Sequence, residues 1–199
     1  MVFLINFMNH SYQFNWRPNV VSCSKCAEVY AEAKDNMFRF VRQLVLSKNI
    51  AVVFEEGGTC LDIRDVLRAH GNETTIAQEV IASISGRSIS HFFVDITEEE
   101  AEALVDAGII ADITELRSHQ CELRDSYMVR TCLTRLADNR DEPVLFLCAD
   151  RHFIGVKRCL EEAGVSAVSD TVARFEWYIS NDQIDSIHMN DHNATEYDR

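Results

Sequence analysis

The sequence predicts an α/β domain with a mainly parallel central sheet of about five strands and helices on both faces. Short apolar runs without alternation, such as residues 144–148, are typical of strands that are buried on both faces of a sheet. Between these runs lie segments with apolar residues at helical spacing, such as residues 27–47, which indicate helices that connect parallel strands. The alternation of the two patterns therefore favours a parallel sheet that is covered on both sides.

The individual elements follow from these two patterns in chain order. The predicted strands are residues 2–7, 50–54, 89–94, 144–148 and 165–168. The predicted helices are residues 27–47, 60–70, 74–84, 98–106, 114–137 and 152–163. Thr97 and Glu100 form a capping box that starts the helix at residue 98, and Gly164 is suited to end the last helix.

Length and composition indicate one domain followed by a tail. A chain of 199 residues is long enough for one hydrophobic core and too short for two comfortable domains. Two prolines and seven glycines leave little material for long flexible linkers. We therefore expect a single domain over residues 1–179 and a polar, acidic C-terminal tail over residues 180–199.

The formal net charge of −13 excludes some classes of partner. Such an acidic surface repels the phosphate backbone, so nucleic acid is not an expected partner. The charge suits either solubility alone or docking onto a basic protein. Gly57 and Gly58 lack the further glycines and the lysine of a phosphate-binding loop, so nucleotide binding is not expected either.

The cysteines and the first residues indicate a cytoplasmic protein. The seven cysteines are odd in number, and Cys148 lies in an apolar run, which is typical of reduced, packed thiols. Cys23 and Cys26 have the spacing of half a zinc site or of a redox pair, but no second pair with this spacing follows. Residues 1–7 are apolar but too short for a signal peptide or a membrane span, so no membrane contact is expected.

Polar residues follow the carboxyl ends of the predicted strands. His10 follows the first strand, Glu55 and Glu56 follow the second, Asp95 follows the third, and His152 follows the fourth. Because these ends meet at one edge of a parallel sheet, the residues are candidates for one site. They suit a divalent metal held by His10, Glu55 and His152, or an acid and a base around a water molecule. The alternative is that the histidines are hydrogen-bonded structural groups and that the glutamates form a solvated turn.

The same residues carry a resemblance to a known superfamily. Residues 7–13 resemble the G-x-x-H segment that opens the TraB/TIKI, ChaN and erythromycin-esterase-like superfamily. Residues 52–56 resemble its second strand with a trailing acidic residue, and residues 145–152 resemble its second G-x-x-H segment in small uncharacterised bacterial members. Residues 124–127 are similar to a helix rich in Arg and Glu that lies between the second glutamate and the last histidine. The order and spacing fit over roughly residues 1–168.

The resemblance implies a cleft lined by the histidines and the glutamate. Some members of the superfamily are metal-dependent proteases and others are metal-independent esterases. By position, His10 and His152 would be metal ligands or general bases, Glu55 or Glu56 the acid/base carboxylate, and Arg124 an anion-stabilising cation.

Two positions depart from the superfamily pattern. Phe7 and Ala149 stand where the motifs have glycine. Glycine lets backbone or substrate approach closely, so a phenylalanine fills space that a ligand would use. This departure leaves a non-catalytic relative that has kept the scaffold as an alternative.

Two functional hypotheses remain open at this point. The first is a small hydrolase-like enzyme, an esterase or metallopeptidase, that activates water with His10, Glu55 or Glu56 and His152, with or without a divalent metal, on a small-molecule or peptide substrate. The second is a non-catalytic acidic protein that neutralises a basic protein partner, as toxin-immunity proteins do.

Overall fold

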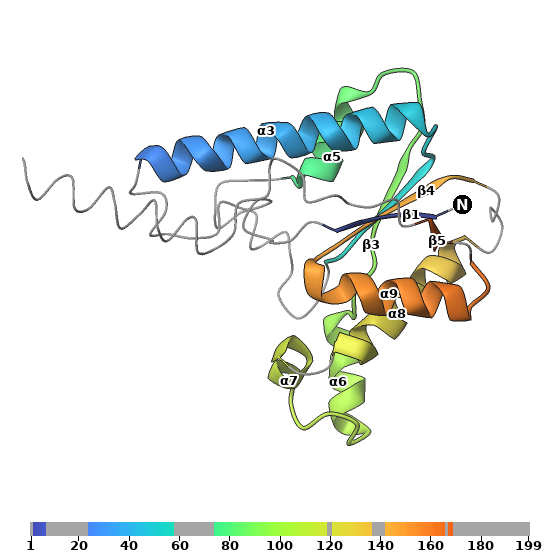
Figure 1. Cartoon of the computed structure of the whole chain (residues 1–199). Helices are drawn as coiled ribbons and strands as arrows, with labels where there is room; N and C mark the ends of the chain where they lie inside the picture. Colours follow the sequence, from blue (N-terminus) through green and yellow to red (C-terminus); the bar gives the residue numbers. More distant parts are fainter. Residues whose placement is uncertain are drawn as a thin grey trace, which may run out of the picture.

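A computed structural model describes most of the chain (Figure 1). The described residues are 2–6, 24–57, 74–118, 121–136, 142–165 and 167–168. Several predictions lie outside these residues, namely His10, Cys23, the helix over residues 60–70 and the tail over residues 180–199.

Five strands form one sheet in which every pairing is parallel. They are β1 (Val2–Asn6), β2 (Val52–Glu55), β3 (Ser90–Phe93), β4 (Val144–Cys148) and β5 (Ala167–Val168). Their order across the sheet is β3-β2-β4-β1-β5. Strand β4 lies in the middle, and its Phe146 is opposite Phe54 on one side and Leu4 on the other. The predicted α/β class with a parallel sheet is confirmed.

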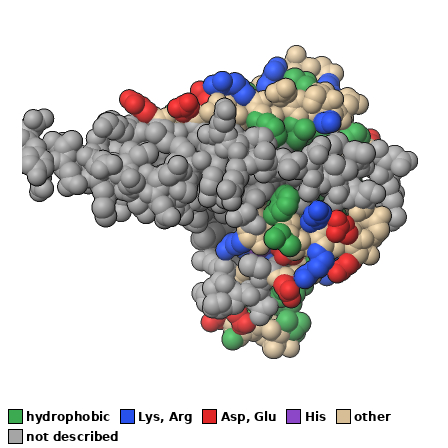
Figure 2. All heavy atoms as spheres, viewed as in Figure 1, with side chains coloured by type: hydrophobic (Ala, Val, Ile, Leu, Met, Phe, Trp, Pro, Cys, Tyr) green, Lys and Arg blue, Asp and Glu red, His purple; other side chains and the backbone are tan. Residues whose placement is uncertain are grey.

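Six helices surround the sheet in the described residues. They are α3 (Ser24–Ser47), α5 (Ile76–Ser83), α6 (Glu98–Asp106), α7 (Ile113–Ser118), α8 (Cys121–Arg135) and α9 (Asp150–Glu162). Helices α3 and α5 lie on one face of the sheet, and α8 and α9 lie on the other, with α6 and α7 beyond them (Figure 1). On the outer surface, basic and acidic side chains intermingle over the α8 and α9 layer (Figure 2).

The alternation of side chains along the strands divides the core into two layers. Val53, Leu145 and Leu147 are buried against α3 and α5. Phe54 and Phe146 point to the opposite face, where they are buried with the apolar residues of α8 and α9. Because β2 and β4 are apolar on both faces, their sequences show no alternation, and this is the pattern that identified them as strands.

Helix ends follow their capping residues. The Thr97 side chain accepts a hydrogen bond from the Glu100 backbone, and the Glu100 side chain accepts one from the Thr97 backbone, so α6 begins at the predicted residue. Thr75 and Gln78 form a second capping box at the start of α5. Gly164 follows α9 with a φ of +77°, a conformation that glycine adopts without strain.

The prediction of one long helix over residues 114–137 was wrong. The structure has two separate helices there, α7 and α8. Leu116 and Leu123 are seven residues apart, which imitates a continuous apolar stripe, and both contact the same small apolar cluster around Ile96 and Leu104. The apolar spacing therefore reflected the packing of two helices into one cluster, and not a single continuous helix.

Two further findings bear on the sequence analysis. None of the helices in the part of the chain that the structure describes is long and apolar enough to cross a membrane. Cys132 and Cys159 are free thiols, and burial raises the pKa of Cys132 well above its usual value.

Candidate functional site

Five charged side chains meet at the carboxyl edge of the sheet, and we call them the Glu56 network. They are Glu56, Asp95, Arg124, Asp125 and His152, and each is at most 6% exposed. Glu56 follows β2, Asp95 follows β3, and His152 lies in the first turn of α9 after β4. The other two come from α8.

The network lies where the connections leave the sheet in opposite directions. The helix after β4 is α9, which covers one face, whereas the described helices after the neighbouring strands β1 and β2 are α3 and α5, which cover the other (Figure 1). In open parallel sheets, a ligand crevice forms outside the carboxyl ends of the strands at such a divergence.

Arg124 is the central cation of the network. Its Nε donates a 3.2 Å hydrogen bond to Asp95, and a terminal nitrogen contacts both the second Asp95 oxygen and Glu56, the latter at 3.0 Å. Asp95 also accepts a 2.8 Å hydrogen bond from the backbone of Ile96. Burial acts to lower the pKa of Arg124, but the hydrogen bonds and charges of Asp95 and Glu56 outweigh burial and raise the pKa above its usual value. The guanidinium is therefore charged at every accessible pH.

Glu56 connects the network to the start of helix α9. Its Oε2 accepts a 2.7 Å hydrogen bond from the backbone N–H of Ala149, the N-cap residue of α9, whose own side chain cannot accept one. The backbone N–H of Glu56 donates to Leu147 at 2.8 Å, which extends the β2–β4 pairing by one residue. The Glu56 carboxylate therefore does what a capping side chain would do, and its negative charge lies at the positive end of the helix dipole.

His152 forms an imidazole–carboxylate pair with Asp125. Its Nδ1 lies 2.6 Å from Asp125 Oδ1, and its Nε2 lies 3.3 Å from Glu56 Oε1. Burial acts to lower the pKa of His152, but the hydrogen bonds to Asp125 and Glu56 and the charge of Glu56 outweigh burial, even against the charge of Arg124, and the pKa is raised above its usual value.

Two neighbours of the His152 ring require different protonation states. Arg151 Nε lies 3.1 Å from His152 Nε2 and donates to it when that nitrogen carries no proton. Glu56 Oε1 accepts from the same nitrogen only when it is protonated. Nε2 of His152 can therefore accept from Arg151 in the neutral ring and donate to Glu56 in the protonated ring.

A second buried polar group, the Glu55 cluster, lies on the opposite face of the sheet. It consists of Glu55, Thr75 and His91. Thr75 Oγ1 donates a 2.8 Å hydrogen bond to Glu55 Oε2, and His91 Nε2 lies 2.7 Å from the same oxygen. Because successive residues of a strand point to opposite faces, Glu55 faces α5 while Glu56 faces α8 and α9. This cluster fixes the first turn of α5 against β2.

The structure brings three of the five predicted site residues into direct contact. Glu56, Arg124 and His152 belong to one network, which Asp95, the further candidate, also joins. Glu55 contacts Thr75 and His91 instead. The position of His10 lies outside the described residues, so its predicted role stays a prediction.

Asp125 is the functional candidate that the sequence analysis missed. It lies in the segment that resembles the superfamily helix, directly after Arg124. A usable signal existed, because Asp125 occupies the same helical stripe as the buried residues Met128, Val129 and Cys132. A carboxylate at an apolar stripe position indicates a buried partner.

The described residues do not form a metal centre by themselves. No group of three or more His, Cys, Asp or Glu side chains within residues 2–6, 24–57, 74–118, 121–136, 142–165 and 167–168 is arranged to hold a metal ion. The predicted metal set of His10, Glu55 and His152 remains a prediction, because one of its members lies outside these residues.

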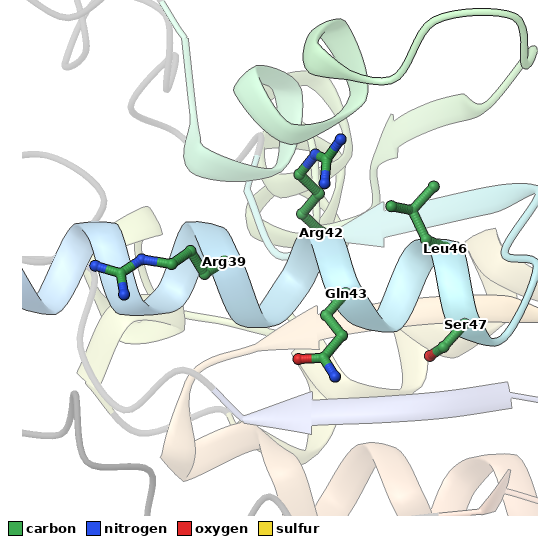
Figure 3. Close-up of a pocket in the computed structure, with 5 residues that line it drawn as sticks. All are labelled: Arg39, Arg42, Gln43, Leu46 and Ser47. Carbon is green, nitrogen blue, oxygen red and sulfur yellow. The ribbon is translucent and has the colours of Figure 1, made fainter.

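A pocket on helix α3 lies away from both polar groups. Figure 3 shows its described lining, which comes from the outward face of the helix. The lining residues are Arg39, Arg42, Gln43, Leu46 and Ser47. All five are exposed, in contrast to the buried network at the sheet edge.

Comparisons with family models, with curated proteins and with solved structures found no match to this chain.

Proposed function

We propose that the chain is a hydrolase-like enzyme in which His152 is the general base that activates a water molecule. The observation that carries the proposal is the 2.6 Å contact between His152 Nδ1 and Asp125 Oδ1, at the edge where parallel sheets bind ligands. The substrate class is a small molecule or a peptide with a hydrolysable acyl bond. The superfamily resemblance of residues 145–152 supports the same reaction class.

The protonation chemistry follows from the partners of the two ring nitrogens. Asp125 accepts the Nδ1 proton, so the lone pair of the neutral imidazole is on Nε2. Nε2 takes the proton from water, and the imidazolium that forms is stabilised by Asp125 on one side and Glu56 on the other. The pKa of His152 is raised above its usual value, so the neutral ring is a stronger base than an ordinary imidazole.

Arg151 and Arg124 have different parts in this proposal. Arg151 is exposed and donates to Nε2, so it must move aside before water reaches that nitrogen. In this proposal the displaced guanidinium then pairs with an anionic group of the substrate or with the oxyanion that forms. Arg124 is buried between Glu56 and Asp95, and its part is to hold these two carboxylates in place. A divalent metal, if one takes part, would need a ligand from outside the described residues, such as His10.

The test is a hydrolysis panel of ester and peptide substrates, with and without added Mn²⁺, Co²⁺ or Zn²⁺. His152→Gln is expected to lower kcat by about 100-fold or more, because it removes the base. Asp125→Asn is expected to lower kcat as well, because an amide at this position favours the wrong imidazole tautomer. His91→Gln, which removes the histidine of the Glu55 cluster, is the matched control and is expected to retain activity. A folded wild-type chain that hydrolyses no member of the panel, or a fully active His152→Gln variant, would falsify the proposal.

A second candidate function is a non-catalytic acidic protein that binds a basic protein. The observation that favours it is the complete burial of His152 together with the net charge of −13, because a closed polar network stabilises a scaffold without any reaction. In that case a basic partner co-purifies with the chain and dissociates as salt is raised. Retention of the partner by His152→Gln would separate this function from the enzymatic one.

A further inference from the structure

We infer that Gly155 is a positioning residue for His152, because the missing side chain at this position makes room for the carboxylate that holds the imidazole. Gly155 lies in α9, three residues after His152, and faces Asp125 of α8. A Cβ at position 155 would lie 1.7 Å from Asp125 Oδ2 and 2.7 Å from its Cγ. No residue with a side chain fits there unless the carboxylate moves.

Backbone conformation does not explain the glycine. Gly155 is inside a 13-residue helix and is not among the glycines with positive φ, which are Gly57, Gly86, Gly108 and Gly164. Inside a helix, glycine destabilises the fold relative to alanine. The requirement for glycine at this position is therefore one of space, and the space is taken by Asp125.

The two oxygens of Asp125 have separate environments. Oδ1 contacts Nδ1 of His152 at 2.6 Å, and Oδ2 lies over the backbone of Gly155. Both contacts are made between α8 and α9, so the close approach of the two helices at Gly155 fixes the carboxylate at hydrogen-bond distance from the ring. A side chain at position 155 would push Asp125 away from His152.

The experiment is a double-mutant cycle of Gly155→Ala and Asp125→Ala, with thermal unfolding and the His152 titration as readouts. The titration is followed by NMR, and the His152 signal is assigned by its loss in His152→Gln, since the chain has seven histidines. Asp125→Ala removes Oδ2 and Cγ, and the Asp125 Cβ would lie 3.3 Å from the new Cβ, a contact that a small shift relieves.

Gly155→Ala is expected to lower Tm and to lower the pKa of His152 by about one unit or more, because the buried ring loses its carboxylate partner. In the Asp125→Ala background, the same substitution is expected to leave Tm unchanged or to raise it, as alanine does inside an ordinary helix. It is also expected to leave the His152 pKa of that background unchanged. A loss of Tm that disappears or reverses in the Asp125→Ala background is the signature of a steric effect on Asp125 alone.

Three results would overturn the inference. They are an unchanged His152 titration in Gly155→Ala, equal Tm losses in both backgrounds, and failure of the double variant to fold when Asp125→Ala folds. If Gly155→Ala alone fails to fold and the double variant folds, the inference is supported.

A catalytic role for Gly155 rests on the proposed function, but the Tm and the His152 titration can be measured whether or not the chain is an enzyme. If the wild-type chain hydrolyses nothing, the proposed function fails while the cycle still reports on His152. If His152 is catalytic but the effects of Gly155→Ala and Asp125→Ala are simply additive, the proposed function stands and only the inferred role of Gly155 is refuted. Where both hold, Gly155→Ala shifts the pH profile of kcat to lower pH along with the His152 pKa.

Discussion

Glu55 and Glu56 are consecutive in the chain, equally buried, and held in different ways on the two faces of the sheet. Glu56 has a permanent cation beside it, Arg124, and a helix N-terminus at its second oxygen. The partners of Glu55 include a hydroxyl and an imidazole that is charged only when protonated, both on Oε2.

The difference indicates different tasks. The Glu56 network joins the ends of three strands to α8 and α9 through several charged groups, so its geometry depends on every member. The Glu55 cluster attaches the start of α5 to β2 through the hydrogen bond from Thr75 to Glu55 Oε2. We therefore expect substitutions in the Glu56 network to have larger effects than matched substitutions in the Glu55 cluster.

The largest effect is expected from Arg124→Met. This change leaves Glu56 and Asp95 buried without their described cation, which costs about 3 to 5 kcal/mol of unfolding free energy. Urea denaturation measures it. Arg130→Met, on the exposed side of the same helix and 3.6 Å from Glu100, is the control and should cost less than about 1 kcal/mol. Equal losses of unfolding free energy in the two variants would mean that the buried ion pairs of Arg124 stabilise the fold no more than an exposed ion pair does.

The next effect separates the two glutamates directly. Glu56→Gln must turn its amide NH₂ toward either Arg124 or the Ala149 N–H, because donors lie at both Glu56 oxygens, and the conflict costs about 2 to 3 kcal/mol. Glu55→Gln can keep its carbonyl toward Thr75 and His91, so these two contacts survive, and its cost is expected to be smaller than that of Glu56→Gln. The same denaturation experiment compares them, and the reverse order of costs would contradict the comparison.

A smaller effect is expected at the helix cap of the Glu55 cluster. Thr75→Ala removes the cap of α5 and the hydrogen bond to Glu55, for a cost of about 2 kcal/mol. Thr97→Ala removes a similar cap at α6 that has no such buried partner, and should cost about 1 kcal/mol. The difference between the two measured costs reports the Thr75–Glu55 bond, and no difference would mean that this bond adds nothing to the cap.

The smallest effect expected is a pH dependence of stability from His152. Its pKa is raised in the folded protein, so its protonated form stabilises the fold. This contribution is complete below the unfolded-state pKa of about 6.5 and is lost as the pH rises through the folded-state value. The difference in unfolding free energy between wild type and His152→Gln should therefore shrink as the pH rises above about 6.5. A difference in unfolding free energy that grows with pH would show that protonation of His152 does not stabilise the fold.

Local rules predicted much of the fold. The run of residues 144–148 matches β4 at both ends, because nothing polar interrupts it. The capping box at Thr97 placed the start of α6 correctly. The break between α7 and α8 was missed because Leu116 and Leu123 pack into the same cluster from two helices. The strand order was not predicted, because the sequence of a parallel strand does not indicate which other strands it pairs with.

The site was predicted less well than the fold. The rule that polar groups gather at the carboxyl ends of strands selected Glu56, Asp95 and His152 correctly as neighbours of one edge. It also grouped Glu55 with Glu56, although the alternation of a strand places consecutive side chains on opposite faces. Asp125 comes from a helix whose position against the strand ends depends on the whole fold, so its contact with His152 could not be read from local patterns.

The central place of β4 has a consequence for how the chain acquires its structure. Strands β1 and β2 are successive in the chain but never touch, because β4 pairs with both. During synthesis, residues 2–6 leave the ribosome long before residues 144–148, the first described partner strand that β1 can meet. Strand β1 therefore cannot pair until these residues have been synthesised. Because assembly of the sheet depends on pairings between segments far apart in the chain, folding is slow, and the apolar strands are exposed to aggregation until it is complete.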